Sequence, residues 1–570
     1  MMLIKNIRIT AVRLAALLVL AALISAGVQA AMAAENTMTM SVGKISDLRT
    51  DLTISSTLMP EIGGRQYYHY YTHFSPLITQ DGDGNIIPWL AESYEISDDH
   101  KTVTFHLRKG VKFADGTPFN ASVAKYNFDR IITYGWPDYV GINGTGAKLT
   151  TFIHYDYSEA PDDYTFVLHF KQGWLDVARD LTISTYPYIG FISPLDVEPA
   201  WDINGALKQE KKYNGLGPYY LDENESVPKQ KIVLKRRQSW QDDLNFHKPT
   251  IDKIVLTCIA EPQTAVLALE KGEIDYICRN WNPSLDSLSK LEGNTKITIE
   301  TRPDTKTYYL STAWWKEPFN GTDGILLRKA ICYALDREEM VEGAFNGYAT
   351  PATDTMWLSP LSPEVPKCCS KGYGYNLENA KKMLTEAGWK DSDGDGILDK
   401  NGRSLKDLNL VITSSTDFLW MKDLALIVQS QLRKIGIDVE IRTLEWADYA
   451  KARSKSGGDY DLILQYNNGR AVSMARELIY FNSTLTAATQ NLYRDSNGTL
   501  EGVAYGARMA SNTDELDEYA CQACEILYDE AGVIPLVHPS EYALMSKKIN
   551  GFEFGVNYWL DHVEECRIED

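Results

Sequence analysis

The stretch that decides the fold runs from Ile87 to Ile131 and reads IPWLAESYEISDDHKTVTFHLRKGVKFADGTPFNASVAKYNFDRI. Residues 102–107 alternate between apolar and polar side chains, which predicts a half-buried strand. Gly110 ends this strand, and Asn120 is a favourable cap for a helix that continues to Ile131. The stretch therefore predicts a scaffold of strand, turn and helix, and none of its residues is a candidate for catalysis.

Outward from this stretch, the chain contains two β-α-β units, each recognised by a change in hydrophobic period. The first comprises a strand at 252–257, a helix at 262–271 that Gly272 ends, and a strand at 273–277. The second comprises a strand at 408–413, a helix at 419–435 and a strand at 438–444. A further helix at 515–531 and a short strand at 533–537 follow near the end of the chain.

The order of these elements predicts an α/β fold with two lobes. The first lobe is expected to comprise residues 35–299 and 533–570, and the second residues 300–532. Because the chain returns to the first lobe, crossing strands should form a hinge with a ligand cleft between the lobes.

Composition narrows the class of partner. The formal net charge is −20, and no run of five or more Lys or Arg occurs, so a basic face for nucleic acid is excluded. Tyrosine and tryptophan are abundant, with 33 and 13 residues. Such rings fill packed cores and also line ligand clefts, because each combines a large apolar surface with a polar tip.

The first 34 residues predict a signal peptide. Basic residues from Lys5 to Arg13 precede an apolar run at 14–26, and Ala31-Met32-Ala33 supplies a small-x-small cleavage site. The apolar run is shorter than the about 20 residues of a transmembrane helix. No cysteine lies directly after this apolar run, so a lipoprotein anchor is not expected. The protein is predicted to be secreted, to the periplasm or the outer face of the cytoplasmic membrane.

Sequence motifs give no support for an enzyme or for a resident metal. GxSxG, GxxxxGK[ST], GxGxxG and HExxH are all absent. Asp391–Asp399 begins like a calcium loop, but Gly402 stands where the EF-hand pattern requires glutamate, which favours a solvated hairpin tip. His69 and His73 would share one face of a helix and could bind a metal, although ordinary surface or core histidines are favoured.

Eight cysteines leave several pairings open outside the membrane. Cys258 and Cys278 belong to two predicted strands that flank one helix, so they could lie close together. Cys521 and Cys524 form a CxxC pair on a predicted helix, which alone is weak evidence for a metal or redox site. The adjacent pair Cys368-Cys369 has the wrong spacing to complete a four-ligand zinc site.

Several segments in one order resemble the family 5 solute-binding proteins of ABC importers, which bind dipeptides, oligopeptides or nickel. They are PWLAES from Pro88, the run from Lys101 to Asn127, NGLGPYYL from Asn214, ALEKGEIDY from Ala268, LLRKAICYALDREEM from Leu326, NLENAKKMLTEAGWKDSDGDGILDKNG from Asn376, QLRKIGIDVEIRTLEWADY from Gln431 and GDYDLIL from Gly458. Together they span nearly the whole chain after the signal peptide.

This resemblance implies a two-lobe, class II fold of the periplasmic-binding-protein type. An extra subdomain, roughly residues 75–190, would be inserted in the first lobe and would contain the opening stretch. The implied function is capture of a peptide or related small solute and its delivery to ABC permease subunits in the membrane. We expect a monomer that needs no cofactor and catalyses no reaction.

The resemblance leaves the ligand open. In dipeptide binders an aspartate follows the strand that matches Leu462 to Gln465, but here the chain reads YNNGRAV from Tyr466. The nickel binder has an arginine and a histidine at positions that look like Gly190 and Gln465. A nickel or metal-chelate ligand therefore stands as the alternative, with a secreted enzyme such as a peptidase, or a receptor without transport, more remote.

Candidate ligand-binding residues follow from position in the resemblance. They come from an early aromatic loop, the loop after the opening helix and the late second lobe: Arg65, Tyr67, Tyr68, Trp136, Tyr139, Trp446, Tyr449, Gln465, Asn467 and Arg470. Their aromatic rings would supply apolar walls and cation–π faces, and the two arginines could pair with a ligand carboxylate.

Overall fold

This computed structural model describes the larger part of the 570-residue chain. The described residues are 36–43, 45, 75–134, 154–182, 191–202, 206–207, 215–237, 249–279, 283–304, 306–353, 365–415, 418–453, 458–466, 474–482, 493, 495, 497–555 and 561–569. The predicted signal peptide lies outside them. Among these residues, no helix combines the length and apolar character needed to cross a membrane.

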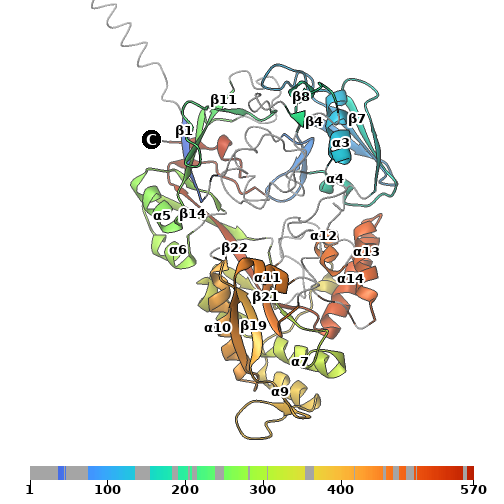
Figure 1. Cartoon of the computed structure of the whole chain (residues 1–570), viewed down its shortest axis with the longest axis vertical. Coiled ribbons are helices and arrows are strands. Elements are labelled where there is room, and N and C mark those ends of the chain that lie inside the picture. Colours follow the sequence, from blue (N-terminus) through green and yellow to red (C-terminus); the bar gives the residue numbers. More distant parts are fainter. Residues whose placement is uncertain are drawn as a thin grey trace, which may run out of the picture.

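One twelve-stranded sheet extends through both lobes, in the order β10-β11-β12-β1-β13-β22-β15-β21-β19-β20, with β14 and β16 paired to β22 (Figure 1). First-lobe strands are β1 (Thr37–Val42), β10 (Tyr219–Leu221), β11 (Lys231–Arg236), β12 (Lys253–Cys258), β13 (Tyr276–Ile277) and β14 (Ile297–Pro303). Second-lobe strands are β15 (Tyr308–Thr312), β16 (Ala349–Pro351), β19 (Leu408–Thr413), β20 (Val439–Leu444) and β21 (Leu462–Tyr466).

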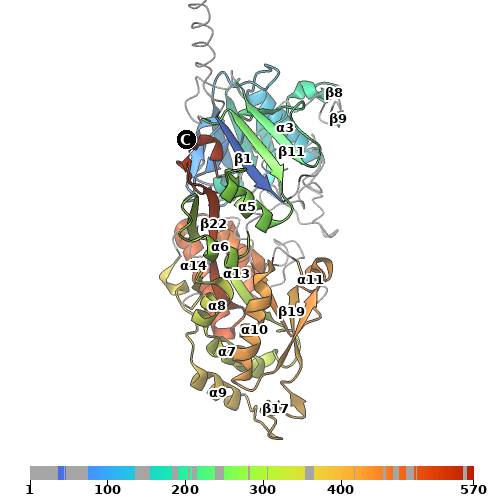
Figure 2. The ribbon, with the colours of Figure 1, turned by 90° about the vertical axis from the view of Figure 1, so that its left-hand side faces the viewer.

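Strand β22 (Ile534–Ser546) joins the lobes (Figure 2). Its first residues pair with β15 and β16 of the second lobe, whereas Ser540 to Ser546 pair with β14 of the first. The sequence predicts only the apolar part of this strand, residues 533–537. The residues beyond it mix polar and apolar side chains, and residues 540–546 are strand because their backbone groups pair with β14. The predicted lobe boundary at 299/300 falls within β14.

The opening stretch belongs to a separate antiparallel sheet, β4-β5-β7-β6. Its strands are β4 (Ala91–Ile96), β5 (Thr102–Leu107), β6 (Tyr155–Glu159) and β7 (Thr165–Phe170), and helix α3 (Ala121–Tyr134) covers it. The predicted strand is confirmed as β5, with Val103, Phe105 and Leu107 buried. Phe128 of α3 packs 5.1 Å from Phe166 of β7, so the stretch builds the core of the inserted subdomain.

Helices cover the sheets on the outside. First-lobe helices are α5 (Pro262–Lys271) and α6 (Leu285–Leu291), and α4 (Val177–Asp180) follows β7 in the inserted subdomain. Second-lobe helices are α7 (Gly321–Ala334), α8 (Arg337–Phe345), α9 (Leu377–Glu386), α10 (Trp420–Arg433), α11 (Trp446–Ala452), α12 (Met474–Leu478), α13 (Thr499–Met509) and α14 (Thr513–Glu530). Gly272 ends α5 at φ 73°, as predicted from the sequence.

Short elements complete the fold. The two-stranded pairs are β2 (Ile78–Gln80) with β3 (Ile86–Pro88), β8 (Val197–Glu198) with β9 (Ala206–Leu207), β17 (Asp399–Lys400) with β18 (Arg403–Ser404), and β23 (Ile549–Asn550) with β24 (Arg567–Ile568). The 3₁₀ turns are η2 (Pro194–Asp196), η4 (Lys367–Cys369), η6 (Ile479–Phe481) and η8 (Val563–Glu565).

The cysteine pairing differs from the expectation that Cys258 and Cys278 lie close together. Cys258 and Cys278 do not form a disulfide with each other, because β1 lies between their strands. Cys368 of η4 instead forms a disulfide with Cys521 of α14. The second half of the CxxC pair, Cys524, is a buried free cysteine.

Candidate ligand-binding site

Aromatic side chains gather at one end of the second-lobe sheet. We call Tyr308, Phe418, Trp420, Trp446 and Tyr466 the aromatic cluster. Tyr308 stacks on Trp420 with ring centroids 3.7 Å apart, and Phe418 stacks on Trp446 at 5.2 Å. Phe418 also lies 4.9 Å from Tyr466, which connects the two stacks. Each ring keeps part of its surface exposed, and Trp446 is 41% exposed, so a ligand could cover these faces.

Topology explains why these rings meet. Strand β19 pairs in parallel with β20 and β21, so the carboxyl ends of all three strands share one edge of the sheet. Phe418 and Trp420 follow β19, Trp446 begins the helix after β20, and Tyr466 ends β21. In open α/β sheets, ligands bind at this edge. Figure 1 shows α11 and β21 at the end of the second lobe nearest the first lobe.

A buried polar layer supports the aromatic cluster. Tyr449 is fully buried, and its hydroxyl donates a hydrogen bond to the Leu464 carbonyl at 2.7 Å. The guanidinium of Arg453 lies 5.7 Å from the ring of Tyr449 and 5.2 Å from that of Tyr466. Gln465 is fully buried, opposite Tyr309 on β15. Among the described residues, both amide atoms of Gln465, and Nε and Nη2 of Arg453, are buried without a hydrogen-bond partner.

The Arg453 guanidinium keeps its charge in this layer. Burial alone lowers the pKa of Arg453, but the hydroxyl groups of Tyr449 and Tyr466 outweigh burial, so the net shift is upward. Burial also raises the pKa of the Tyr449 hydroxyl, which stays protonated as a donor. The Nε and Nη2 atoms lie on one edge of the Arg453 guanidinium. In other proteins this edge binds a carboxylate through two parallel hydrogen bonds. This layer can therefore recognise a negative group.

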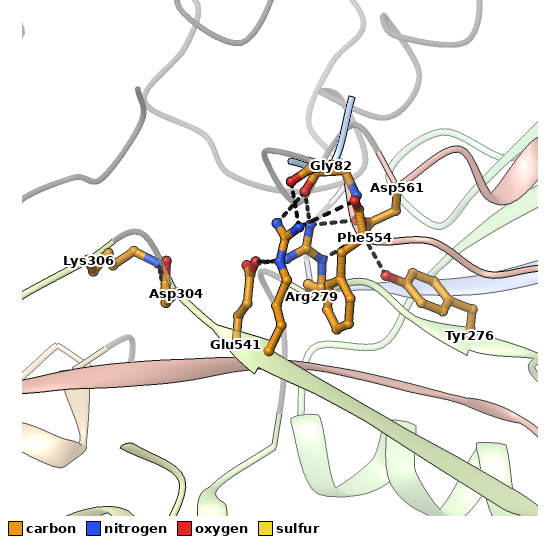
Figure 3. Close-up of polar contacts among 10 residues, drawn as sticks. Gly82, Tyr276, Arg279, Asp304, Lys306, Glu541, Phe554 and Asp561 are labelled. Carbon is orange, nitrogen blue, oxygen red and sulfur yellow. Dashed lines mark hydrogen bonds and ion pairs between the residues drawn. The ribbon is translucent and has the colours of Figure 1, made fainter. Parts of the chain in front are cut away.

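An ion pair lies between β14 and β15, where the chain passes from the first lobe to the second. Lys306 Nζ donates to Asp304 Oδ2 at 2.6 Å, and Figure 3 shows both beside the crossing strands. Burial opposes the charge on Lys306, but the Asp304 carboxylate outweighs it and raises the pKa of Lys306. The pair adds charged groups close to Tyr308 of the aromatic cluster.

The crossing strands are fixed to the first lobe by a buried charge network (Figure 3). We call Arg279, Arg302, Glu541 and Asp561 the junction network. Arg279 Nε donates to Asp561 Oδ2 at 2.7 Å, and Glu541 on β22 accepts from both arginines. Although burial lowers the pKa of Arg279, Asp561 and Glu541 raise it more strongly, so the arginine stays charged. The network ties β14 and β22 to the region after β13.

Two more groups complete the junction. The ring of Phe554 lies 4.9 Å from each of the Arg279 and Arg302 guanidinium groups. Arg302 Nη1 donates to the Gly82 carbonyl in the β2–β3 turn at 3.0 Å. A Cβ atom at Gly82 would lie 2.3 Å from the Phe554 carbonyl oxygen, so this close approach requires glycine.

The lobes also touch away from the crossing strands. Arg508 of α13 forms an ion pair with Asp180 of α4 in the inserted subdomain, and we call it the distal ion pair. Their side chains are only 2% and 0% exposed. Trp174 donates from Nε1 to Asp180 at 2.7 Å and stacks under Arg508 at 5.2 Å. Arg508 Nε and Nη1 have no hydrogen-bond partner.

The predicted ligand-binding residues fall into two groups. Trp446, Tyr449 and Gln465 are described and lie together, with Trp446 and Tyr449 ring centroids 5.7 Å apart. Tyr449 and Gln465 lie in the buried layer beneath the exposed rings. The other candidates lie outside the described residues, as do His69 and His73; they are Arg65, Tyr67, Tyr68, Trp136, Tyr139, Asn467 and Arg470.

Sequence reasoning missed Tyr308, Phe418, Trp420, Tyr466 and Arg453. Two signals were present. Phe418 and Trp420 come directly after a predicted strand, at the position where α/β proteins bind ligands. Arg453 follows Tyr449 by four residues at the end of α11, which places both on one face.

The loop Asp391–Asp399 forms a turn. Asp391, Asp393 and Asp395 are exposed, and their nearest carboxylate oxygens lie within 4.8 Å of one another. Asp391 already accepts hydrogen bonds from the backbone N–H groups of Gly394 at 2.7 Å and Gly396 at 3.1 Å. The N–H of Ile397, and then Lys406, lower the pKa of Asp395. These contacts are those of a solvated hairpin tip, the structure that the sequence favours.

Comparison with known sequences identifies a family. Residues 85–488 match the profile of the family described as "Bacterial extracellular solute-binding proteins, family 5 Middle". The chain is 26% identical over 503 residues to the oligopeptide-binding protein AppA of Bacillus subtilis, aligning 86% of this chain with 85% of that protein. It is 28% identical over 396 residues to the nickel-binding periplasmic protein of Escherichia coli, covering 67% of each.

Comparison with solved structures confirms the fold. NikA from Brucella suis, in complex with Fe(III)-EDTA, superposes with a TM-score of 0.76 at 23% identity. The superposition covers 94% of this chain and 100% of the NikA chain. The predicted two-lobe architecture of the periplasmic-binding-protein type is therefore correct.

Proposed function

Because the chain belongs to family 5 of the bacterial extracellular solute-binding proteins, we propose that it captures a peptide or related small solute and delivers it to ABC permease subunits. The aromatic cluster is the observation that carries this proposal. It lies at the carboxyl edge of parallel strands, above a buried arginine whose carboxylate-binding edge has no partner. A peptide offers both apolar side chains for the rings and a carboxylate for Arg453.

Lobe closure supplies the link between binding and delivery in this proposal. Strands β14 and β22 cross between the lobes and serve as the hinge, and the ligand contacts both lobes only when they are closed. The proposal keeps the predicted division into residues 35–299 with 533–570, an insertion at roughly 75–190, and residues 300–532. It also keeps the candidates of the first lobe, from Arg65 to Tyr139, as the opposite wall.

The proposal extends to the state of the protein in the cell. Family members are binding proteins, and we propose that this chain likewise catalyses no reaction. We propose that the signal peptide is cleaved and that the protein is a monomer outside the cytoplasmic membrane, without a lipid anchor because no cysteine lies directly after the apolar run.

A metal chelate is the second candidate ligand. One relative is named a nickel-binding periplasmic protein. A chelate formed by an amino acid or polycarboxylate presents carboxylate oxygens, which suit Arg453 in the same way as a peptide terminus. His69 and His73 remain possible metal ligands within this candidate.

A thermal-shift screen tests the proposed function. The purified mature protein is heated with dipeptides, oligopeptides, Ni(II), and Ni(II) with histidine. A ligand that binds the folded state should stabilise it by about 2.7 kcal/mol at 100 times Kd and so raise the melting temperature, with a stabilisation that grows with the logarithm of the ligand concentration. Peptides recovered intact after incubation agree with the proposal, whereas hydrolysis would show an enzyme. A panel without any shift would reject peptides and nickel chelates as ligands.

A further inference from the structure

Four cysteines meet on one face of α14, although the sequence separates them into two distant pairs. Cys368 and Cys369 are adjacent in η4, and Cys521 and Cys524 lie one turn apart on α14. Cys368 and Cys521 form a disulfide, with Cα atoms 5.5 Å apart and a sequence separation of 153. This bond places the remaining two cysteines beside each other.

The remaining two thiols face one another. Cys369 Sγ lies 3.9 Å from Cys368 Sγ and 3.4 Å from the carbonyl oxygen of Ala520, on the preceding turn of α14. Cys524 follows Ala520 by four residues, so it occupies the same face of the helix. Cys369 is close enough to Cys524 to raise the pKa of its thiol. Both residues are buried, with 1% and 2% exposure.

Contacts of the segment after η4 fix the position of η4 along α14. Tyr373 stacks on Tyr528 with ring centroids 4.8 Å apart, and its hydroxyl donates to the Tyr528 carbonyl at 2.5 Å. Arg337 Nη1 donates to the Tyr373 carbonyl at 3.0 Å. Because these contacts fix the segment one turn beyond Cys524, the two free cysteines meet in a defined arrangement.

We propose that Cys369 and Cys524 form a second disulfide beside Cys368–Cys521, giving a double covalent link between η4 and α14. Extracytoplasmic proteins form such bonds because thiol–disulfide oxidants act in that compartment. The two thiols transfer two electrons to the S–S bond of the oxidant, a protein or small-molecule disulfide. Their two protons end on its two reduced thiols, and the Cys369–Cys524 bond forms.

Burial sets the order of events. The neighbouring Cys369, together with burial, raises the pKa of the Cys524 thiol above its ordinary value. The thiolate that attacks a disulfide is therefore scarce once the segment is docked. Oxidation takes place during folding, while η4 is still accessible to the oxidant.

Peptide mapping of the full-length secreted protein tests this inference. The protein is denatured without reductant but with a chelator, alkylated with iodoacetamide and digested with trypsin. Cleavage after Lys367 and Lys371 releases Cys368-Cys369-Ser370-Lys371, and cleavage after Arg508 and Lys547 releases residues 509–547. Two disulfides give a joined species four hydrogen masses below the sum of the two peptides, without alkylation. A joined species with two alkyl groups would overturn the inference.

The number of alkylated thiols gives a second test, because the presence and the absence of the second disulfide predict changes of opposite sign for Cys369→Ser. Two disulfides use four of the eight cysteines, leaving four: Cys258, Cys278, Cys332 and Cys566. Cys369→Ser should then raise the count to five by releasing Cys524. If the second bond were absent, the same change would lower the count from six to five. Release of Cys521 instead of Cys524 would contradict the pairing, and eight thiols after chelation would indicate a metal site.

Discussion

Replacing Arg508 with methionine should weaken ligand binding by up to about 100-fold, because the loss of the distal ion pair favours separation of the lobes. In the closed arrangement, Arg508→Met removes the cation that pairs with the buried Asp180 carboxylate and leaves the Trp174 Nε1 hydrogen bond to it in place. Breaking a buried pair from one side costs about 3–5 kcal/mol. Once the lobes separate, water solvates Asp180, so the cost falls mainly on the closed state. The apparent Kd rises as the binding-competent fraction falls.

Calorimetric titration of a ligand from the thermal-shift screen measures this effect. Arg433→Met is the matched control, because Arg433 pairs with Asp438 on the exposed surface of the second lobe. Exposed pairs contribute about 0–1 kcal/mol, so the control should bind like the wild-type protein. If Arg508→Met lowered the melting temperature but left Kd unchanged, the α4–α13 contact would be a fixed structural one that does not open.

Replacing Asp561 with alanine should lower the free energy of unfolding by about 3–5 kcal/mol, the largest stability effect we expect from one substitution. The change leaves the 2%-exposed Arg279 side chain without the carboxylate that holds its Nε and Nη2 atoms. It also removes the acceptor of the Tyr276 hydroxyl, 2.8 Å away, and of the Gly555 N–H, 3.0 Å away. Urea denaturation followed by circular dichroism measures the loss as a lower transition midpoint.

The comparison needs two further variants. Asp459→Ala breaks the exposed pair with Arg442 and should change the free energy of unfolding by no more than about 1 kcal/mol. The double variant Arg279→Met with Asp561→Ala removes both charges and should recover part of the loss, since much of that loss comes from the buried Arg279 cation, which has lost one of its two carboxylate partners. An Asp561→Ala protein as stable as the Asp459→Ala control would mean that the junction network does not hold the crossing strands.

Local patterns predicted local structure well. Strand β5 and helix α3 follow from alternation and capping within a few residues, and both packed as expected. The long strand β22 was only half predicted, because its second part mixes polar residues with the buried Ala543, Leu544 and Met545 and is strand through pairing with β14. Its pairing partner is distant in sequence, so no local period reveals it.

The candidate site was harder to predict because it is assembled from separate segments. Trp446 and Gln465 could be proposed by position, but their neighbours come from the ends of β15, β19 and β21. Knowing that these ends meet requires the strand order. Arg508 and Asp180 are 328 residues apart, and nothing in either local sequence indicates a buried pair.

The most direct test of the central claim is the dissociation constant of one ligand for Trp446→Ala, measured by titration calorimetry against wild-type protein and Trp315→Ala. Trp315 is a fitting control, because it is 38% exposed, close to the 41% of Trp446, but follows the opposite end of β15 from Tyr308. If the ligand lies on the aromatic cluster, Trp446→Ala should weaken binding about 10-fold or more, and Trp315→Ala should bind like the wild-type protein. Equal dissociation constants for all three proteins would contradict a ligand site at the aromatic cluster.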